Sequence, residues 1–279
     1  MRLHKLVVSS YKLLALSFHP SPMSDTGDFL VFIPPDLTSA KPIRLYSNPM
    51  CPFSQRIRLS LRAKQVDFSQ YFVHLVRKPE WFLQLNPHGT TPTLEHKGQI
   101  IPDSKIGMEY IDECFTCDRR LLSVDPMERA QQKIYVEEFG SKFLPSFFKV
   151  LKAGDPDGSG FLGIKNYLIY FNEFLNKRDL PLVSGEEPGF PDYAIYPFFE
   201  RLEGLATVFS KDLLVWLQDQ AHESVPLFFE FISTMQKDPP VQATALTSEQ
   251  HASHYKSFKL GVPKYCVDST TPLYTAPPK

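Results

Sequence analysis

The sequence predicts a small α/β domain followed by an all-helical domain. In residues 41–122, short runs of alternating apolar and polar residues, typical of strands, are interleaved with amphipathic stretches of helical period. In residues 123–262, apolar residues recur at helical spacing. A disordered or targeting leader of residues 1–40 and a disordered, Thr- and Pro-rich tail of residues 263–279 are expected to flank the two domains.

The composition is that of an ordinary soluble protein with a core of its own. The 279 residues are 43% hydrophobic and 22% charged, enough to build one or two domains. Lysine and arginine number 30 against 31 acidic residues, so no overall charge favours nucleic acid or an anionic membrane as a partner. Four cysteines do not make a disulfide scaffold, and we therefore expect a reducing, cytoplasmic location.

The leader leaves a second location open. It has no acidic residue before Asp25, and Arg2, Lys5 and Lys12 are scattered among apolar residues. A leader without function, a mitochondrial targeting segment and a secretory signal all remain open, although Lys12 interrupts the apolar run. Mitochondrial targeting is the second choice after the cytoplasm.

The first candidate functional residue is Cys51, at the junction of a strand and a helix. A strand pattern begins at Ile43, and the apolar stripe of a helix begins at Phe53. Pro52 suits the first helical position, which places Cys51 at the N-cap. The unpaired N–H groups and partial positive charge of a helix N terminus favour a thiolate over a thiol. Cys51 is therefore a candidate nucleophile, although a free cysteine is often only a small buried residue.

The α/β domain is expected to continue with five elements: a strand over 68–75, a helical turn from 78, a turn over 86–89, a hairpin of 93–95 with 99–101, and a helix over 104–115. The strand over 68–75 should lie parallel to the first one, with the helix after Cys51 as a right-handed crossover. Ile106 and Tyr110 supply part of the apolar face of the last helix. This order of elements is that of a thioredoxin-like domain.

Several motifs of this domain resemble known families. Cys-Pro-Phe-Ser, starting at Cys51, resembles the Cys-Pro-aromatic-Cys/Ser site of glutaredoxins, and Ser54 in place of a second cysteine implies monothiol chemistry. KPEWF from Lys78, NPHGTTPTLE from Asn86 and the Asp-Ser pair at 103 and 104 resemble the omega class of glutathione transferases. The likeness extends over most of residues 43–240. It implies the glutathione transferase fold, a thioredoxin-like domain followed by an all-α domain.

The resemblance also implies a glutathione site, made of Phe53, Lys78, Thr91, Pro92, Asp103 and Ser104. Thr91, before a cis-proline, would hold the cysteinyl unit of glutathione. Lys78 would face the glycyl carboxylate, and Asp103 with Ser104 would hold the γ-glutamyl end at a helix N terminus. Phe231 stands where relatives carry a tryptophan in the acceptor pocket. The residues alone also allow a trans bend at Pro92, a solvated Lys78 and a plain helix cap at Asp103.

Two other groups of residues are assigned no function. Cys114 and Cys117 form a C-x-x-C at the C-terminal end of a helix, where the dipole disfavours a thiolate. His251 and His254 are expected on an exposed polar helix face. Two cysteines without a matching histidine pair do not make a zinc site, so no metal is predicted.

In the second half, Asp125, Pro126 and Glu128 predict the start of a long helix that reaches Leu151, with Ile134 on its apolar side. Further segments are expected as helices over 161–176, 192–208 and 226–235 and a long loop over 208–225. Asp192 is expected to be a buried capping acid. Gly189 stands where a Ser or Thr would complete its capping box, a loss of roughly 0.5–1 kcal/mol.

We therefore expect a glutathione-dependent thioltransferase and dehydroascorbate reductase, with methylated arsenicals and protein mixed disulfides as further acceptors of the family. The resemblance also implies a homodimer, formed through the α/β domain and the long helix. The motif at Cys51 also resembles that of chloride intracellular channel proteins, which are proposed to insert the following segment into membranes. Arg56, Arg58, Arg62 and Lys64 oppose insertion, because each costs roughly 2.5–3.5 kcal/mol at the centre of a spanning helix.

Overall fold

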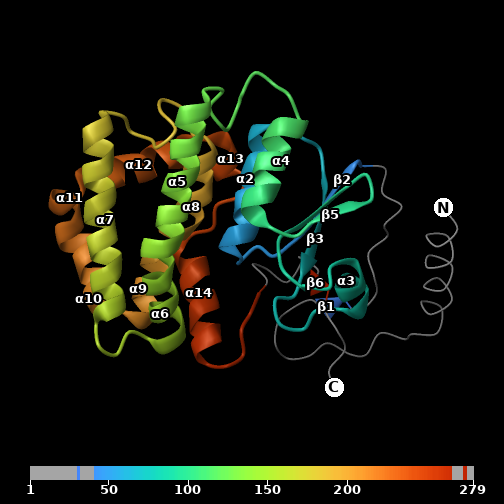
Figure 1. The fold of residues 1–279 in the computed structure, drawn as a ribbon. Coiled ribbons are helices and arrows are strands. Elements are labelled where there is room, and N and C mark those ends of the chain that lie inside the picture. Colours follow the sequence, from blue (N-terminus) through green and yellow to red (C-terminus); the bar gives the residue numbers. More distant parts are fainter. Residues whose placement is uncertain (1–29, 32–40, 266–272, 275–279) are drawn as a thin grey trace, which may run out of the picture.

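The computed structural model describes residues 30–31, 41–265 and 273–274, which form an α/β domain and a helical domain side by side (Figure 1). The α/β domain contains the strands β2 (Ile43–Ser47), β3 (Ser69–Val73), β4 (Thr93–His96) and β5 (Gln99–Ile101), and the helices α2 (Pro52–Ala63), α3 (Glu80–Leu85) and α4 (Ser104–Cys114). Each of these elements lies where the sequence predicts it.

The sheet is mixed, with β3 parallel to β2 and the hairpin β4–β5 antiparallel on the other side of β2. Two short strands, β6 (Leu273–Tyr274) and β1 (Leu30–Val31), extend it beyond β3, giving the order β1-β6-β3-β2-β4-β5. Both belong to the segments predicted as tail and leader, as does Tyr265, which is buried beside Met50. Residues 1–29, 32–40, 266–272 and 275–279 lie outside the described residues.

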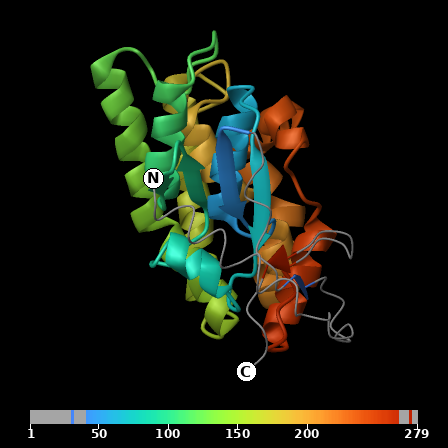
Figure 2. The same ribbon diagram turned by 90° about the vertical axis from the view of Figure 1, so that its right-hand side faces the viewer.

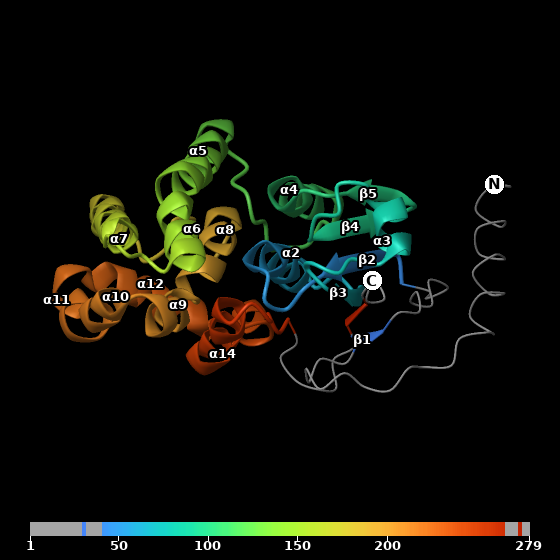
Figure 3. The ribbon, with the colours of Figure 1, turned by 90° about the horizontal axis from the view of Figure 1, so that it is seen from below.

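Helices α2 and α4 cover one face of the sheet, and α3 covers the other (Figures 2 and 3). The expected apolar face of α4 is wrong at Ile106, which is 62% exposed. Helix α4 instead turns Gly107, Met108 and Ile111 inward. Gly107 allows the close approach, since a Cβ there would lie 2.7 Å from Ile57 Cδ1 of α2.

The helical domain comprises α5 (Pro126–Lys142), α6 (Leu144–Ala153), α7 (Ser159–Arg178), α8 (Phe190–Phe199), α9 (Leu202–Phe209), α10 (Lys211–Val215), a π-helix (Trp216–Gln220), α11 (Ala221–Ser224), α12 (Pro226–Lys237), α13 (Pro239–Gln242) and α14 (Ser248–Lys259). The predicted loop over 208–225 is therefore mostly helical. Helix α5 begins as predicted, with the Asp125 carboxylate accepting a hydrogen bond from Glu128 N.

Two helices predicted as continuous are each divided in the structure. The segment 128–151 divides at Phe143, because Pro145 cannot donate to the residue four positions earlier. The segment 192–208 divides after Phe199, where the Arg201 side chain donates to the Pro197 carbonyl and the Arg201 N–H bonds Phe198 instead. The break turns the side chains at 200 and 201 toward the α/β domain, where they bond Gln55 of α2.

The core of the helical domain is aromatic. Phe139, Phe143 and Phe147 are buried and meet Phe198 and Phe199 of α8 mostly edge to face, the arrangement favoured by ring quadrupoles. Within α5, Phe139 lies on the buried face together with Tyr135 and Val136, which sets the rotation of this helix about its axis. Consequently Ile134, expected on the apolar side, is 59% exposed.

Gly189 is the N-cap of α8 for a steric reason. The buried Asp192 carboxylate accepts hydrogen bonds from Val183 N, Ser184 N and Gly189 N, so it acts as the predicted capping acid. A Cβ at position 189 would lie 2.4 Å from Ser184 Oγ and 2.7 Å from the Leu121 carbonyl oxygen. The tight approach of these two segments leaves no room for a side chain.

Gly189→Ser should therefore destabilise the protein, although a serine would supply the oxygen that the capping box lacks. Overpacking of this kind costs about 1–3 kcal/mol, more than the roughly 0.5–1 kcal/mol gained from a cap. The free energy of unfolding, measured with urea, should fall. A more stable variant would show that the cap, and not the contact with Leu121, decides the residue at this position.

The two histidines of α14 are buried, so their expected exposure is wrong. His251 Nε2 lies 3.0 Å from a Glu200 carboxylate oxygen, and His254 Nδ1 lies 2.5 Å from the Lys264 carbonyl oxygen. Burial lowers the pKa of both imidazoles to about 4. Both histidines are therefore neutral at pH 7.

These histidines predict a loss of stability in weak acid. An unfolded histidine takes up a proton near pH 6.5, whereas His251 and His254 in the folded protein do so only near pH 4. Between these values the unfolded state binds more protons, so the free energy of unfolding falls as pH falls through this window. Urea unfolding at several pH values should show this slope, and His251→Gln should reduce it. A slope unchanged in the variant would contradict the assignment.

Candidate active site

The turn before α2 presents Cys51, and Asn48 holds that turn together. Every polar group of Asn48 is bonded: its N–H to Ser54 Oγ at 3.3 Å, its Oδ1 to Met50 N at 2.9 Å and its Nδ2 to the Val73 carbonyl of β3 at 3.0 Å. Its carbonyl accepts from Cys51 N at 3.2 Å. The turn is thereby fixed to the sheet on one side and to the first turn of α2 on the other.

Cys51 is the N-cap of α2, as predicted, with Pro52 at the first helical position. Its side chain caps no backbone N–H, so the sulfur is left for chemistry. The Thr91–Pro92 peptide bond is cis, as the resemblance implies, and the Cys51 thiol donates to the Thr91 carbonyl at 3.6 Å. Cys51 is only 7% exposed.

Arg56 connects two residues of the predicted glutathione site, Phe53 and Ser104, to the helical domain. Its Nη1 donates to Ser104 Oγ at 3.2 Å and its Nε to the Ala194 carbonyl at 2.8 Å. Its guanidinium lies over the rings of Phe53 and Phe198, 5.0 and 5.2 Å from the centroids. Burial lowers the pKa of Arg56 to about 10, against the opposing charges of nearby acidic groups and Cys51. Arg56 therefore remains a cation at neutral pH.

The remaining predicted residues lie around the same region. Asp103 is exposed and caps α4, accepting from Lys105 N at 2.8 Å and Ile106 N at 3.0 Å, so the plain cap is present whether or not Asp103 also meets a ligand. Lys78 is half-buried, and a Cβ at Gly89 would lie 3.3 Å from its Cδ. Phe53 also stacks on Phe148 of α6. Helix α2, the cis-proline turn and the start of α4 thus frame one site.

Phe231 does not line an open pocket. It is fully buried, with its ring centroid 5.1 Å from that of Phe171 and 6.0 Å from that of Phe199. The side chain belongs to the aromatic core between α7, α8 and α12. The expected place of Phe231 in an acceptor pocket stays a prediction.

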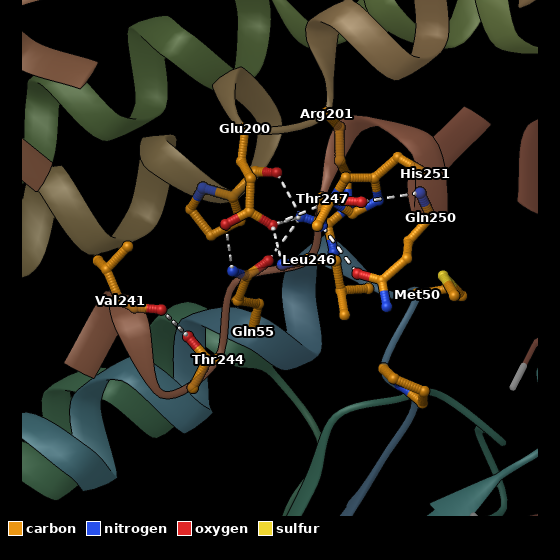
Figure 4. A network of polar contacts seen from close by, with 12 residues as sticks. Met50, Gln55, Glu200, Arg201, Val241, Thr244, Leu246, Thr247, Gln250 and His251 are labelled. Atoms are coloured by element: carbon orange, nitrogen blue, oxygen red, sulfur yellow. Dashed lines mark hydrogen bonds and ion pairs between the residues drawn. The ribbon is translucent and has the colours of Figure 1, made fainter. Parts of the chain in front are cut away.

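A polar network joins α2 to the helical domain one turn beyond Cys51 (Figure 4). Gln55 donates to Glu200 Oε2 at 2.9 Å and accepts from Arg201 Nη1 at 2.5 Å. His251 of α14 bonds Oε1 of the same carboxylate. Arg201 and His251 are each 1% exposed. These contacts were not predicted, because they join residues about 50 to 150 positions apart in the sequence. The one local signal was the polar Gln55, which lies on the buried side of α2.

The Cys-x-x-C segment is separate from this site. Cys114 ends α4 and is exposed, and its sulfur lies 4.0 Å from Nδ1 of His96, which also contacts the Tyr110 hydroxyl. Cys117 is exposed as well and donates to the Arg119 carbonyl. Within the described part of the chain, no group of three or more His, Cys, Asp or Glu side chains is arranged to hold a metal.

None of the helices in the described ranges is both long enough and apolar enough to span a membrane. Helix α2, which follows the cysteine, carries buried Arg56 and Arg58, and its last turn carries Arg62. Helix α2 therefore lies in the protein core, where Arg56 and Arg58 have hydrogen-bond partners.

Comparison with known proteins places the chain among glutathione-dependent enzymes. The family model described as glutathione S-transferase, N-terminal domain, matches residues 50–114. Pyrimidodiazepine synthase of Drosophila melanogaster is 34% identical over 237 residues, which cover 83% of this chain and 92% of that protein. Glutathione S-transferase omega-1 of Sus scrofa is 35% identical over 204 residues, 72% of this chain and 79% of that protein.

Solved structures agree on the fold. Glutathione transferase Omega 3C of Trametes versicolor superposes with a TM-score of 0.66 at 20% identity, covering 80% of this chain and 94% of that chain. Rice GST1, solved in complex with glutathione, superposes with a TM-score of 0.70 at 20% identity, covering 80% of this chain and all of that one. The predicted fold, a thioredoxin-like domain followed by helices, is confirmed.

Proposed function

The chain belongs to the omega class of glutathione transferases, and from this premise we propose that it is a thioltransferase and dehydroascorbate reductase with Cys51 as nucleophile. It is a glutathione transferase, and glutathione is its cosubstrate. The observation that carries the proposal is the residue at the N terminus of α2. A cysteine there, beside a cis-proline turn, favours thiol–disulfide exchange.

The proposed reaction with a mixed disulfide has two exchange steps. The Cys51 thiolate attacks the glutathionyl sulfur of the substrate, the acceptor leaves as a thiolate, and Cys51 becomes a glutathione adduct. A second glutathione thiolate then attacks the adduct, releases glutathione disulfide and restores the Cys51 thiolate. With dehydroascorbate, two glutathione molecules supply two electrons and two protons and leave as one disulfide.

The glutathione site proposed is the one framed by Phe53, Lys78, Thr91, Pro92, Asp103 and Ser104. Ser104 lies at the first position of α4, where backbone N–H groups and the helix dipole attract a carboxylate. The buried Arg56 cation adds to that attraction through its bond to Ser104. Lys78, half-buried beside Gly89, offers a second positive charge for the glycyl end.

A chloride intracellular channel protein is the less favoured alternative. Such a role would require the segment after Cys51 to leave the core, and Arg56 and Arg58 would then lose the carbonyl partners that satisfy them there. The cytoplasm stays the proposed location, with mitochondrial targeting by residues 1–40 as second choice.

Cys51→Ala should abolish glutathione-dependent reduction of a mixed disulfide and of dehydroascorbate, to below a few per cent of the wild-type rate. The variant should remain folded, because loss of one buried sulfur costs about 1 kcal/mol. Cys114→Ala, which alters an exposed thiol, is the matched control and should keep full activity. Substantial turnover by Cys51→Ala would eliminate this cysteine as the nucleophile.

A homodimer is proposed through α4 and α5. The ion pairs Lys105–Glu137 and Lys133–Glu109 join these helices. Two apolar side chains next to them in the sequence, Ile106 and Ile134, are 62% and 59% exposed, and Met127 of α5 is 68% exposed. Exposed apolar residues gathered in this way are typical of an interface.

Light scattering of the wild type at micromolar concentration should give the mass of a dimer, and Ile134→Glu should give a monomer, because the interface would bury an unpaired charge. Leu162→Glu, at an equally exposed apolar position of α7, should remain a dimer. A monomeric wild type would rule out the dimer.

A further inference from the structure

Arg58 lies two helical turns after Cys51, on the same face of α2. Helical side chains point back toward the N terminus, and that of Arg58 reaches the turn before the cysteine. Its Nη1 donates to the Asn48 carbonyl and its Nη2 to the Pro49 carbonyl, both at 3.3 Å. The guanidinium is therefore hydrogen-bonded to two of the three residues that precede Cys51.

The charge of Arg58 has no partner of its own. Arg58 is 6% exposed, and among the residues that the structure describes no carboxylate lies within ion-pair distance of it. Its Nε has no hydrogen-bond partner. Lys64, a buried cation at the end of the same helix, is by contrast paired with Asp112. A buried cation held only by carbonyls is costly unless an anion forms nearby.

The charges around Arg58 come from several elements, and they leave an excess of positive charge. Arg201, at the junction of α8 and α9, adds a second positive charge beside Arg58, and Glu200 adds one negative charge. Helix α2 also carries Arg56, whose own charged neighbours include Asp103 and Glu137. His251 of α14 is neutral because burial lowers its pKa to about 4. The guanidinium groups of Arg58 and Arg201 thus face the single carboxylate of Glu200, and the Cys51 thiolate would balance the sum.

The pKa of Arg58 agrees with this count of charges. Burial lowers the pKa of Arg58 to about 10, and the neighbouring Arg201 acts in the same direction. The charges of Cys51 and Glu200 act in the opposite direction. Because electrostatic coupling is mutual, a group whose positive charge is stabilised by a thiolate also stabilises that thiolate.

We propose that Arg58 is a positioning residue, which holds the turn that carries Cys51 and supplies the buried positive charge against which the Cys51 thiolate forms. The inference rests on the proposed role of Cys51 as nucleophile. It assigns two effects to one side chain: the carbonyl contacts fix the sulfur in place, and the charge sets the pH at which the thiolate appears.

The test is the rate at which iodoacetamide alkylates Cys51 from about pH 5 to pH 9, followed by mass spectrometry of the Cys51 peptide. Arg58→Met keeps an unbranched side chain and removes the charge. It should move the midpoint of the profile upward by about one pH unit, so that alkylation is about tenfold slower below the midpoint. Arg62→Met removes an exposed charge of the same helix and should leave the midpoint in place.

Two further variants separate charge from structure. Glu200→Gln removes the nearby negative charge and should move the midpoint downward, opposite to Arg58→Met. Arg58→Lys keeps the charge, so the midpoint of its alkylation profile should stay near that of the wild type. The alkylation rate at the high-pH plateau should change, because the contacts to Asn48 and Pro49 are altered. A loosened turn alone would change the plateau and not the midpoint.

The inference is overturned if folded Arg58→Met keeps the wild-type midpoint, or if Glu200→Gln moves it upward. Should Arg58→Met fail to fold, as judged by circular dichroism, Arg58→Lys and Glu200→Gln decide the question by the same criteria. Alkylation does not require turnover. An active Cys51→Ala enzyme would therefore contradict the proposed function, whereas an unmoved midpoint would contradict the role of Arg58 alone.

Discussion

The burial of two arginines in helix α2 is the constraint on which the arrangement of the site depends. Arg56 and Arg58 are 3% and 6% exposed. A buried guanidinium must find hydrogen-bond acceptors, and here they come from three different places: the Ala194 carbonyl of α8, Ser104 of α4, and the turn that begins at Asn48. Satisfying the two cations therefore positions the helical domain, the start of α4 and the turn that carries Cys51 at the same time.

Polar contacts accompany the apolar ones between the two domains for the same reason. Lys64, at the end of α2, bonds Asp112 and the Arg119 carbonyl, both at 2.9 Å. The Arg119 side chain continues to Tyr193 at 2.6 Å and Asp238 at 3.0 Å. Separating the domains would take the Ala194 carbonyl from Arg56 and would part Arg119 from Asp238, and a buried charge that loses its partner costs several kcal/mol. These contacts hold the two domains together, and Arg56 also bonds Ser104 of the candidate site.

The sequence predicted the features that are set locally. Alternation and helical period located the strands and helices of the α/β domain, and a proline at the first helical position placed Cys51 and Asp125 at N-caps. What depends on distant partners could not be predicted. His251 looked exposed on a polar helix because its partner, Glu200, is 51 positions away. Ile106 was assigned to the core because the close approach of Gly107 to Ile57 is invisible to periodicity.

Ser54 links the turn to the proposed monothiol chemistry. It is fully buried, and its oxygen accepts a hydrogen bond from Asn48 N, so the hydroxyl helps to build the turn that presents Cys51. A dithiol enzyme would place its resolving sulfur at this position. The other thiols described, Cys114 and Cys117, lie at the far end of α4, about 15 Å along the helix from Ser104. Because neither of these two described thiols stands at the position of Ser54, the proposed mechanism assigns the resolution of a Cys51 adduct to a second glutathione.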